Sequence, residues 1–117
     1  MHSITIRKEK DGKIYHDISL TRGDSLPLQL SLKKNNESYM PGSEAYIRFA
    51  MKARYNDETP VLIKEIPVDT LQLIFIPEDT KNLPMRKTYV YDIELTDESG
   101  YVTTFIEGRF TVGEEVM

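Results

Sequence analysis

The segment spanning residues 87–112 limits the possible folds of this chain more than any other. Two runs of alternating apolar and polar residues flank the tetrapeptide Asp97-Glu98-Ser99-Gly100. On the first run apolar side chains recur at every second position from Tyr89 to Leu95. On the second, Val102, Thr104 and Ile106 alternate with Tyr101, Thr103 and Phe105. Alternation with period two on both sides of a glycine-containing turn predicts an antiparallel hairpin, with one face in a core and the other in water. The chain is therefore expected to be a β protein.

Further strand signals recur along the chain, with turn residues between them. Leucine occupies every second position from Leu26 to Leu32, and a second apolar stripe runs from Ala45 to Met51. Pro27 has no backbone N–H, so its strand is expected to begin at a sheet edge or just after a bend. Residues 77–84 begin and end with proline and carry acids after the first one, which predicts a single helical turn.

These patterns predict an all-β fold, an immunoglobulin-like antiparallel β-sandwich of about seven to eight strands with one short helical turn near residues 77–83. The length of 117 residues fits a single domain that covers the whole chain, 1–117.

Several residues are expected to have structural roles. Gly23 and Asp24 lie in a turn, where glycine accepts positive φ and aspartate bonds nearby backbone amides. Thr80 precedes Tyr89 across a corner, an order similar to the tyrosine corner, and Tyr89 is the residue expected to bond the preceding loop. In the final hairpin, Gly100 belongs to the turn. Tyr91, Asp92 and Gly108 are also expected to have structural roles there. Gly108 is expected to mark a bulge.

Composition excludes several classes of function. The chain has no cysteine, and its net charge of −4 is spread along the sequence without a basic stripe. No disulfide, thiolate metal site or nucleic-acid partner is therefore expected. The start lacks the pattern of a signal peptide, and the longest nearly apolar run is too short to cross a bilayer. The two histidines, His2 and His16, are too few for an ordinary zinc site. We expect no membrane partner, no metal and no cofactor.

Two short motifs have simpler explanations than function. Arg22-Gly23-Asp24 matches the integrin-recognition tripeptide, but a turn between two strands explains the same residues. Asn36-Glu37-Ser38 matches a glycosylation acceptor, which has little meaning without a secretory signal.

Acids and tyrosines leave two alternatives open. Asp92, together with Asp97 or Glu98, offers a carboxylate pair for a hydrolase, although solvated acids on a strand face are commoner. The chain has seven tyrosines and no tryptophan. Tyrosine suits interfaces and sugar stacking, so Tyr15, Tyr46 and Tyr55 remain candidates for a carbohydrate- or receptor-binding surface.

One strand segment is apolar on both of its faces. Its members are Leu71, Leu73 and Phe75 on one side, with Ile74 and Ile76 on the other. Such a strand is either covered on both sides or meets a partner with its outer face. These five residues therefore form the predicted interface.

The order of several motifs resembles a known family. These motifs are TRGDS at 21–25, LPL at 26–28, IRFAMK at 47–52, IPEDTKNLP at 76–84, YVYDIEL at 89–95 and GRFTV at 108–112. Together they resemble the N-terminal domain of the baseplate upper protein of siphophages that infect Gram-positive bacteria, from Ile14 to Val112. The resemblance implies a β-sandwich that docks into a multi-subunit assembly, with receptor binding done by other parts. The long helical and distal regions of the full baseplate protein are absent here, so a stand-alone structural or adaptor protein is expected.

The resulting hypothesis is a phage or prophage virion structural protein, associated with the baseplate, tail or head. It is expected to act through protein–protein contacts with other phage structural proteins or copies of itself, and not as an enzyme. It would be made in the host cytoplasm and then join the virion. The alternative is an immunoglobulin-like carbohydrate- or receptor-binding module.

Overall fold

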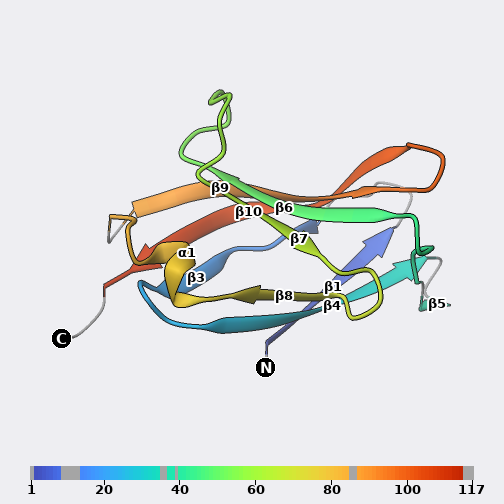
Figure 1. Ribbon diagram of the computed structural model, residues 1–117, viewed down its shortest axis with the longest axis horizontal. Helices are drawn as coiled ribbons and strands as arrows, with labels where there is room; N and C mark the ends of the chain where they lie inside the picture. Colours follow the sequence, from blue (N-terminus) through green and yellow to red (C-terminus); the bar gives the residue numbers. More distant parts are fainter. Residues whose placement is uncertain (1, 9–13, 35–36, 39, 85–86, 115–117) are drawn as a thin grey trace.

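A computed structural model describes residues 2–8, 14–34, 37–38, 40–84 and 87–114. Within these residues the chain forms ten strands and one helix (Figure 1). The elements are β1 His2–Lys8, β2 Ile14–Tyr15, β3 Ile18–Thr21, β4 Leu26–Lys34, β5 Glu37–Ser38, β6 Tyr46–Lys52, β7 Leu62–Ile66, β8 Gln72–Phe75, α1 Pro77–Thr80, β9 Lys87–Thr96 and β10 Val102–Gly113. The predicted all-β class is confirmed, and α1 is the predicted helical turn. No helix in the described part of the chain is long and apolar enough to span a membrane.

The strands form two sheets in a sandwich-like arrangement (Figure 1). Sheet A contains β4 with β1 on one side, and β5 and β8 also pair with β4. Sheet B has the order β2-β10-β9-β6-β7, and β3 also pairs with β10. The smaller sheet A lies below the larger sheet B in the view of Figure 1.

Both sheets are mixed, whereas the sequence led us to expect antiparallel pairing throughout. β1 pairs parallel to β4, and both β2 and β3 pair parallel to β10. Parallel neighbours require a crossover between the sheets, and alternation within one strand does not reveal the direction of its neighbour. The immunoglobulin-like topology stays a prediction.

Pro27 lies just after a bend, which is one of the two positions expected for it, and not in an edge strand. β4 lies between β1 and β8, so it is a central strand of sheet A. Pro27 faces Ile74 of β8, while pairing with β1 begins one residue later, at Leu28. The missing N–H therefore lies before the ladder with β1 starts, which is why proline is tolerated in this strand.

The core is centred on aromatic rings from both sheets. The ring of Phe75, from sheet A, lies 5.2 Å from the ring of Phe49 and 5.2 Å from that of Phe110. Tyr91 stacks on Phe49 at 5.2 Å. All four side chains are almost fully buried. Edge-to-face and offset ring contacts of this kind stabilise a core beyond the effect of area burial alone, so this cluster joins the two sheets.

The final hairpin forms as predicted, with β9 antiparallel to β10. The bulge, however, lies between Thr104 and Ile106 and not at Gly108. Its extra residue allows the adjacent side chains of Phe105 and Ile106 both to be buried. Gly108 has a different role, because a Cβ atom there would lie 1.9 Å from the backbone oxygen of His16. Glycine thus lets the β2–β3 connection approach β10.

An ion pair connects the two sheets at one side of the sandwich. There β7 and β8, which follow each other along the chain, lie at the edges of sheet B and sheet A. The Lys64 amine on β7 lies 2.7 Å from a carboxylate oxygen of Asp79 on α1, and it also lies over the ring of Phe75. The same carboxylate oxygen accepts a hydrogen bond from the backbone N–H of Ile76 at 2.9 Å. Both charged side chains are largely buried, so this contact holds the edges of the two sheets together at one side of the sandwich.

Candidate functional site

The Arg22-Gly23-Asp24 turn is held against α1. Gly23 has φ of 84°, and its N–H donates to the hydroxyl of Thr80 at 2.9 Å. Thr80 is completely buried. The Arg22 guanidinium donates to the carbonyl of Leu83 at 3.4 Å, and Asp24 lies exposed. These contacts give the tripeptide a structural role in joining the β3–β4 turn to the helix.

The tyrosine that bonds a distant backbone group is Tyr91, not the expected Tyr89. The Tyr91 hydroxyl donates to the carbonyl oxygen of His16, in the β2–β3 connection. Burial, and secondarily the nearby charge of Asp17, raises the pKa of the Tyr91 phenol above its usual value. Tyr89 is also buried, with the Lys87 amine 5.4 Å from its ring centre. Both tyrosines are therefore parts of the core.

The acids proposed for hydrolysis are not brought together. Asp92 lies 2.9 Å from the guanidinium of Arg48. The Asp97 carboxylate instead accepts bonds from Ser99 and Tyr101 inside the hairpin turn, where Gly100 has φ of 88°. Because five strand positions separate Asp92 from Asp97, their backbones lie roughly 16 Å apart. The turn residue Glu98 lies on the far side of Asp97, so neither acid pairs with Asp92.

The five residues of the predicted interface divide between the two faces of sheet A. Leu71, Leu73 and Phe75 are at most 5% exposed and belong to the core, so they are not available to a partner. Ile74 and Ile76 are 44% and 43% exposed. The two-sided apolar character of this strand therefore has two causes, which are burial on the inner face and an open aliphatic surface on the outer face.

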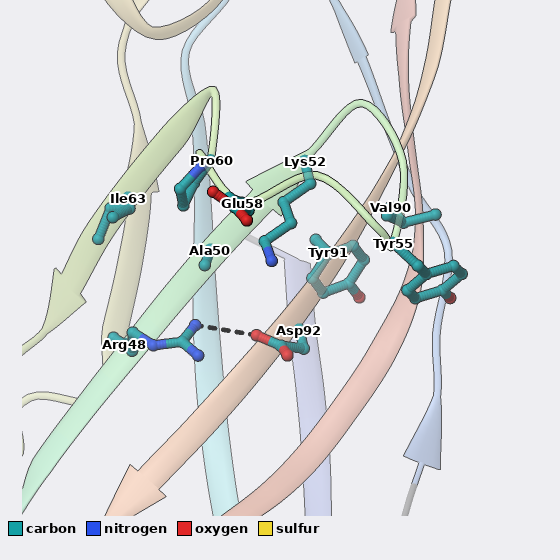
Figure 2. A pocket seen from close by; sticks show the side chains of 10 residues that line it. All are labelled: Arg48, Ala50, Lys52, Tyr55, Glu58, Pro60, Ile63, Val90, Tyr91 and Asp92. Carbon is teal, nitrogen blue, oxygen red and sulfur yellow. Dashed lines mark hydrogen bonds and ion pairs between the residues drawn. The ribbon is translucent and has the colours of Figure 1, made fainter.

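A shallow groove on the outer face of sheet B was not predicted from the sequence. It lies where the loop at 53–61 rises over β6, β7 and β9, and it has a volume of about 300 Å³ (Figure 2). Ala50 explains the hollow, because this small residue lies between Ile63 and Asp92 in the sheet register. The rim residues are Tyr55 and Pro60.

Charged side chains line one part of this groove. Arg48 is held at 2.9 Å by Asp92 and at 2.9 Å by Glu94, so its guanidinium is already paired. Lys52 extends over the groove, and neither it nor Glu58 forms a hydrogen bond or ion pair within the described part of the chain (Figure 2). The groove thus offers one cation and one carboxylate to a ligand.

Only one of the three open tyrosine candidates lies at this groove. Tyr55 is 65% exposed on its rim. Tyr15 belongs to β2, and Tyr46, at the start of β6, shares the outer face of sheet B with Arg48, but neither ring lines the groove. The sequence carried one indication of this groove. Tyr55 and Pro60 lie in the connection that follows β6, and Ala50 is a small residue within that strand.

Metal and modification sites gain no support from the geometry. In the residues that the structure describes, no group of three or more histidines and acids is placed to hold a metal ion. His16 is exposed and acts through its backbone carbonyl. The side chain of His2 and the acceptor residue Asn36 lie outside what the structure describes.

Comparison with known proteins supplies a relationship at the level of fold. No family model matches the chain, and no curated protein matches it. Among solved structures, the N-terminal domain of ORF48 of phage TP901-1 superposes with a TM-score of 0.56 at 10% sequence identity. The match covers 97% of this chain and 98% of that one. The chain therefore has the fold of this phage domain, which agrees in general with the resemblance seen in the sequence, whereas membership in the baseplate upper protein family stays a hypothesis.

Proposed function

We propose that this protein is a virion structural protein of a phage or prophage, associated with the baseplate, tail or head. It acts by binding other phage structural proteins and not by catalysis. The observation that carries this proposal is the fold match to a phage domain across 97% of the chain. A match over the full length of both chains indicates that the whole sandwich is shared and not a single hairpin motif.

The surface chemistry is consistent with this proposal. The Arg48 guanidinium is paired with two acids, and Asp97 is used inside a turn. Ile74 and Ile76 leave aliphatic surface exposed on sheet A, which is compatible with contact to another protein. We further propose that no cofactor, nucleic acid or membrane takes part, and that the protein passes from the host cytoplasm into the particle.

Mass spectrometry of purified particles tests the proposal. Particles are induced from a strain that carries the gene, purified on a density gradient, and stripped of loosely bound protein with high salt. Peptides of this chain are expected to remain with the particles in a fixed ratio to a known tail protein. If the chain is abundant in the induced lysate but missing from gradient-purified particles, the proposal is wrong.

A second candidate function is the binding of a saccharide in the groove of sheet B. The observation in its favour is the exposed ring of Tyr55 beside Lys52 and Glu58, a combination of a stacking surface and polar groups. A glycan array followed by titration of any hit tests this candidate. Binding is expected to be lost in Tyr55→Ala and kept in Tyr101→Ala, which removes a similarly exposed tyrosine outside the groove. An array without hits, or equal losses in both variants, would exclude the groove.

A further inference from the structure

The groove on the outer face of sheet B continues toward β10 along one row of side chains. In the sheet register, Lys52 of β6 lies opposite Val90 of β9, and Val90 lies opposite Arg109 of β10. Residues opposite each other on neighbouring strands point to the same face of a sheet, so these three side chains share the outer face. Lys52 and Val90 also line the groove (Figure 2). Two cations therefore flank Val90, with their backbones about 10 Å apart.

Both cations are available to a ligand. Neither the Lys52 amine nor the Arg109 guanidinium forms a hydrogen bond or ion pair with a residue that the structure describes. The next row of the sheet holds Thr88 and Thr111, whose hydroxyl oxygens lie 3.3 Å apart. Because only one of these hydroxyls donates to the other, the second keeps a proton for a ligand. Cations and hydroxyl donors gathered in this way suit a carboxylate or a phosphate group.

The acids around this row do not cancel the two cations. The Asp92 carboxylate is already held in an ion pair at 2.9 Å, and Asp17 accepts a backbone N–H. Glu107 is not free either. Among the described residues that line the groove, Glu58 is the unpaired acid. The chain has a net charge of −4, but charges more than about 8 Å away are largely screened at physiological salt, so the two nearby cations dominate.

We propose that this groove binds an acidic saccharide, with a sugar ring stacked on Tyr55 and the carboxylate or phosphate group held over Val90 between Lys52 and Arg109. The inference rests on the second candidate function, which is the binding of a saccharide in this groove. The Tyr55 ring is 65% exposed on the rim and offers the apolar face that a sugar ring stacks on. Lys52 lies between this ring and Arg109, so one ligand contacts both ends of the site.

The size of the site favours a sugar over a protein partner. The groove has a volume of about 300 Å³, which is at the lower end of the range for pockets that bind small molecules. A specific protein partner instead covers about 800 Å² on each side of an interface. The row from Lys52 to Arg109 extends the groove by only two strands, so the site accommodates one or a few sugar rings.

Glu58 distinguishes an acidic ligand from a neutral one. Its carboxylate repels a nearby anionic group, so Glu58→Gln is expected to strengthen the binding of an acidic saccharide about twofold. A neutral sugar would instead donate a hydroxyl proton to this carboxylate, and the same substitution would weaken its binding. Salt gives a second criterion, because screening is expected to weaken an acidic ligand and to leave a neutral one unchanged.

Titration of the labelled chain, followed by NMR, tests the inference with two matched pairs of probes. Trigalacturonate is compared with its methyl ester, which lacks the negative charges, and glucose 6-phosphate is compared with glucose. The first pair supplies a carboxylate and the second a phosphate. We expect at least one acidic probe to bind with a dissociation constant of roughly 1 mM or below, and at least about tenfold more tightly than its neutral counterpart.

Substitutions place the anionic group. Lys52→Gln and Arg109→Gln are each expected to weaken the binding of the acidic probe about three- to fivefold, as expected for exposed charge pairs. The control is Lys81→Gln, which makes the same change in net charge at a 53% exposed residue of α1 and should leave binding unchanged. Circular dichroism confirms that the three variants are folded.

Several results would overturn the inference. Equal affinities within both pairs of probes, or equal losses in Arg109→Gln and Lys81→Gln, would leave saccharide binding in place but remove the acidic group. Tighter binding of an acidic peptide such as triglutamate, lost in Arg109→Gln, would assign the two cations to a protein partner. If none of the four probes binds, the inference fails, while a neutral hit on the glycan array would still support the second candidate function. The proposed role in the particle is tested separately by mass spectrometry.

Discussion

The ion pair between Lys64 and Asp79 offers the sharpest test of how the sandwich is held closed. The two side chains are only 18% and 11% exposed, and the amine lies 2.7 Å from the carboxylate. In Asp79→Ala the amine loses its partner above Phe75, and the N–H of Ile76 loses its acceptor. A charge-assisted hydrogen bond contributes about 1.5–3 kcal/mol, and the loss of one partner from a fully buried pair costs about 3–5 kcal/mol. Since this pair is not fully buried, we expect a loss of about 3 kcal/mol.

A double-mutant cycle with Lys64→Met and Asp79→Asn isolates the interaction itself. Methionine keeps the apolar contact with Phe75, and the asparagine oxygen still accepts from the N–H of Ile76. Equilibrium unfolding in urea, followed by tyrosine fluorescence and circular dichroism, gives the four free energies. We expect a coupling energy of about 1–2 kcal/mol at neutral pH.

The chain provides a matched control on its surface. Lys81 and Glu78 lie 3.7 Å apart and are 53% and 64% exposed. The same cycle on this pair should give at most about 0.5 kcal/mol, since exposed ion pairs contribute little. Equal coupling energies for the two pairs, or a negligible one between Lys64 and Asp79, would refute the view that this ion pair closes the sandwich.

Three further predictions follow from single contacts. Gly108→Ala is expected to lower the free energy of unfolding by at least about 3 kcal/mol, because its methyl group would overlap with the His16 oxygen. The control is Gly113→Ala, whose new methyl group would have its nearest neighbour at 3.7 Å. This control should be nearly neutral in the same urea titration. Tyr91→Phe should cost about 1 kcal/mol at neutral pH by removing the bond to His16. Because the Tyr91 pKa is raised in the folded state, wild-type stability should also fall above about pH 10, more steeply than in Tyr91→Phe; parallel alkaline curves would contradict this. Asp97→Ala should cost about 1–2 kcal/mol in thermal unfolding by leaving the donors of the hairpin turn unsatisfied, and an unchanged midpoint would show that water replaces the carboxylate.

The sequence predicted well what depends on short-range pattern. Residues 87–112 form the expected hairpin, because period-two alternation and a glycine turn act over only a few residues. The short helix after Ile76 was also predicted, since a proline at its first position and an acid in the first turn favour it locally. The five residues of the predicted interface were only partly placed, because a two-sided apolar strand does not reveal which side faces the core.

Other features depend on contacts between distant segments. The bulge falls at Phe105 and not at Gly108, since the need for glycine there comes from His16, which is far away in the sequence. The backbone acceptor of the Tyr91 hydroxyl has the same origin. The groove over Ala50 requires a loop to rise beside two paired strands. The bulge position and the acceptor of the Tyr91 hydroxyl have no local signature, and the groove has only the tyrosine and the proline that follow the alanine-containing strand.

The sequence by itself determined that this chain is built of strands, because alternating side chains can bury one face only in a sheet. It also determined where the final hairpin turns. Only the tertiary structure decided which strands are neighbours, that β1 and β3 run parallel to their partners, and which isoleucines remain in water. The physical reason is that strand pairing joins segments far apart in the chain, so the direction and order of neighbours are set by the closing of the whole core and not by any one segment.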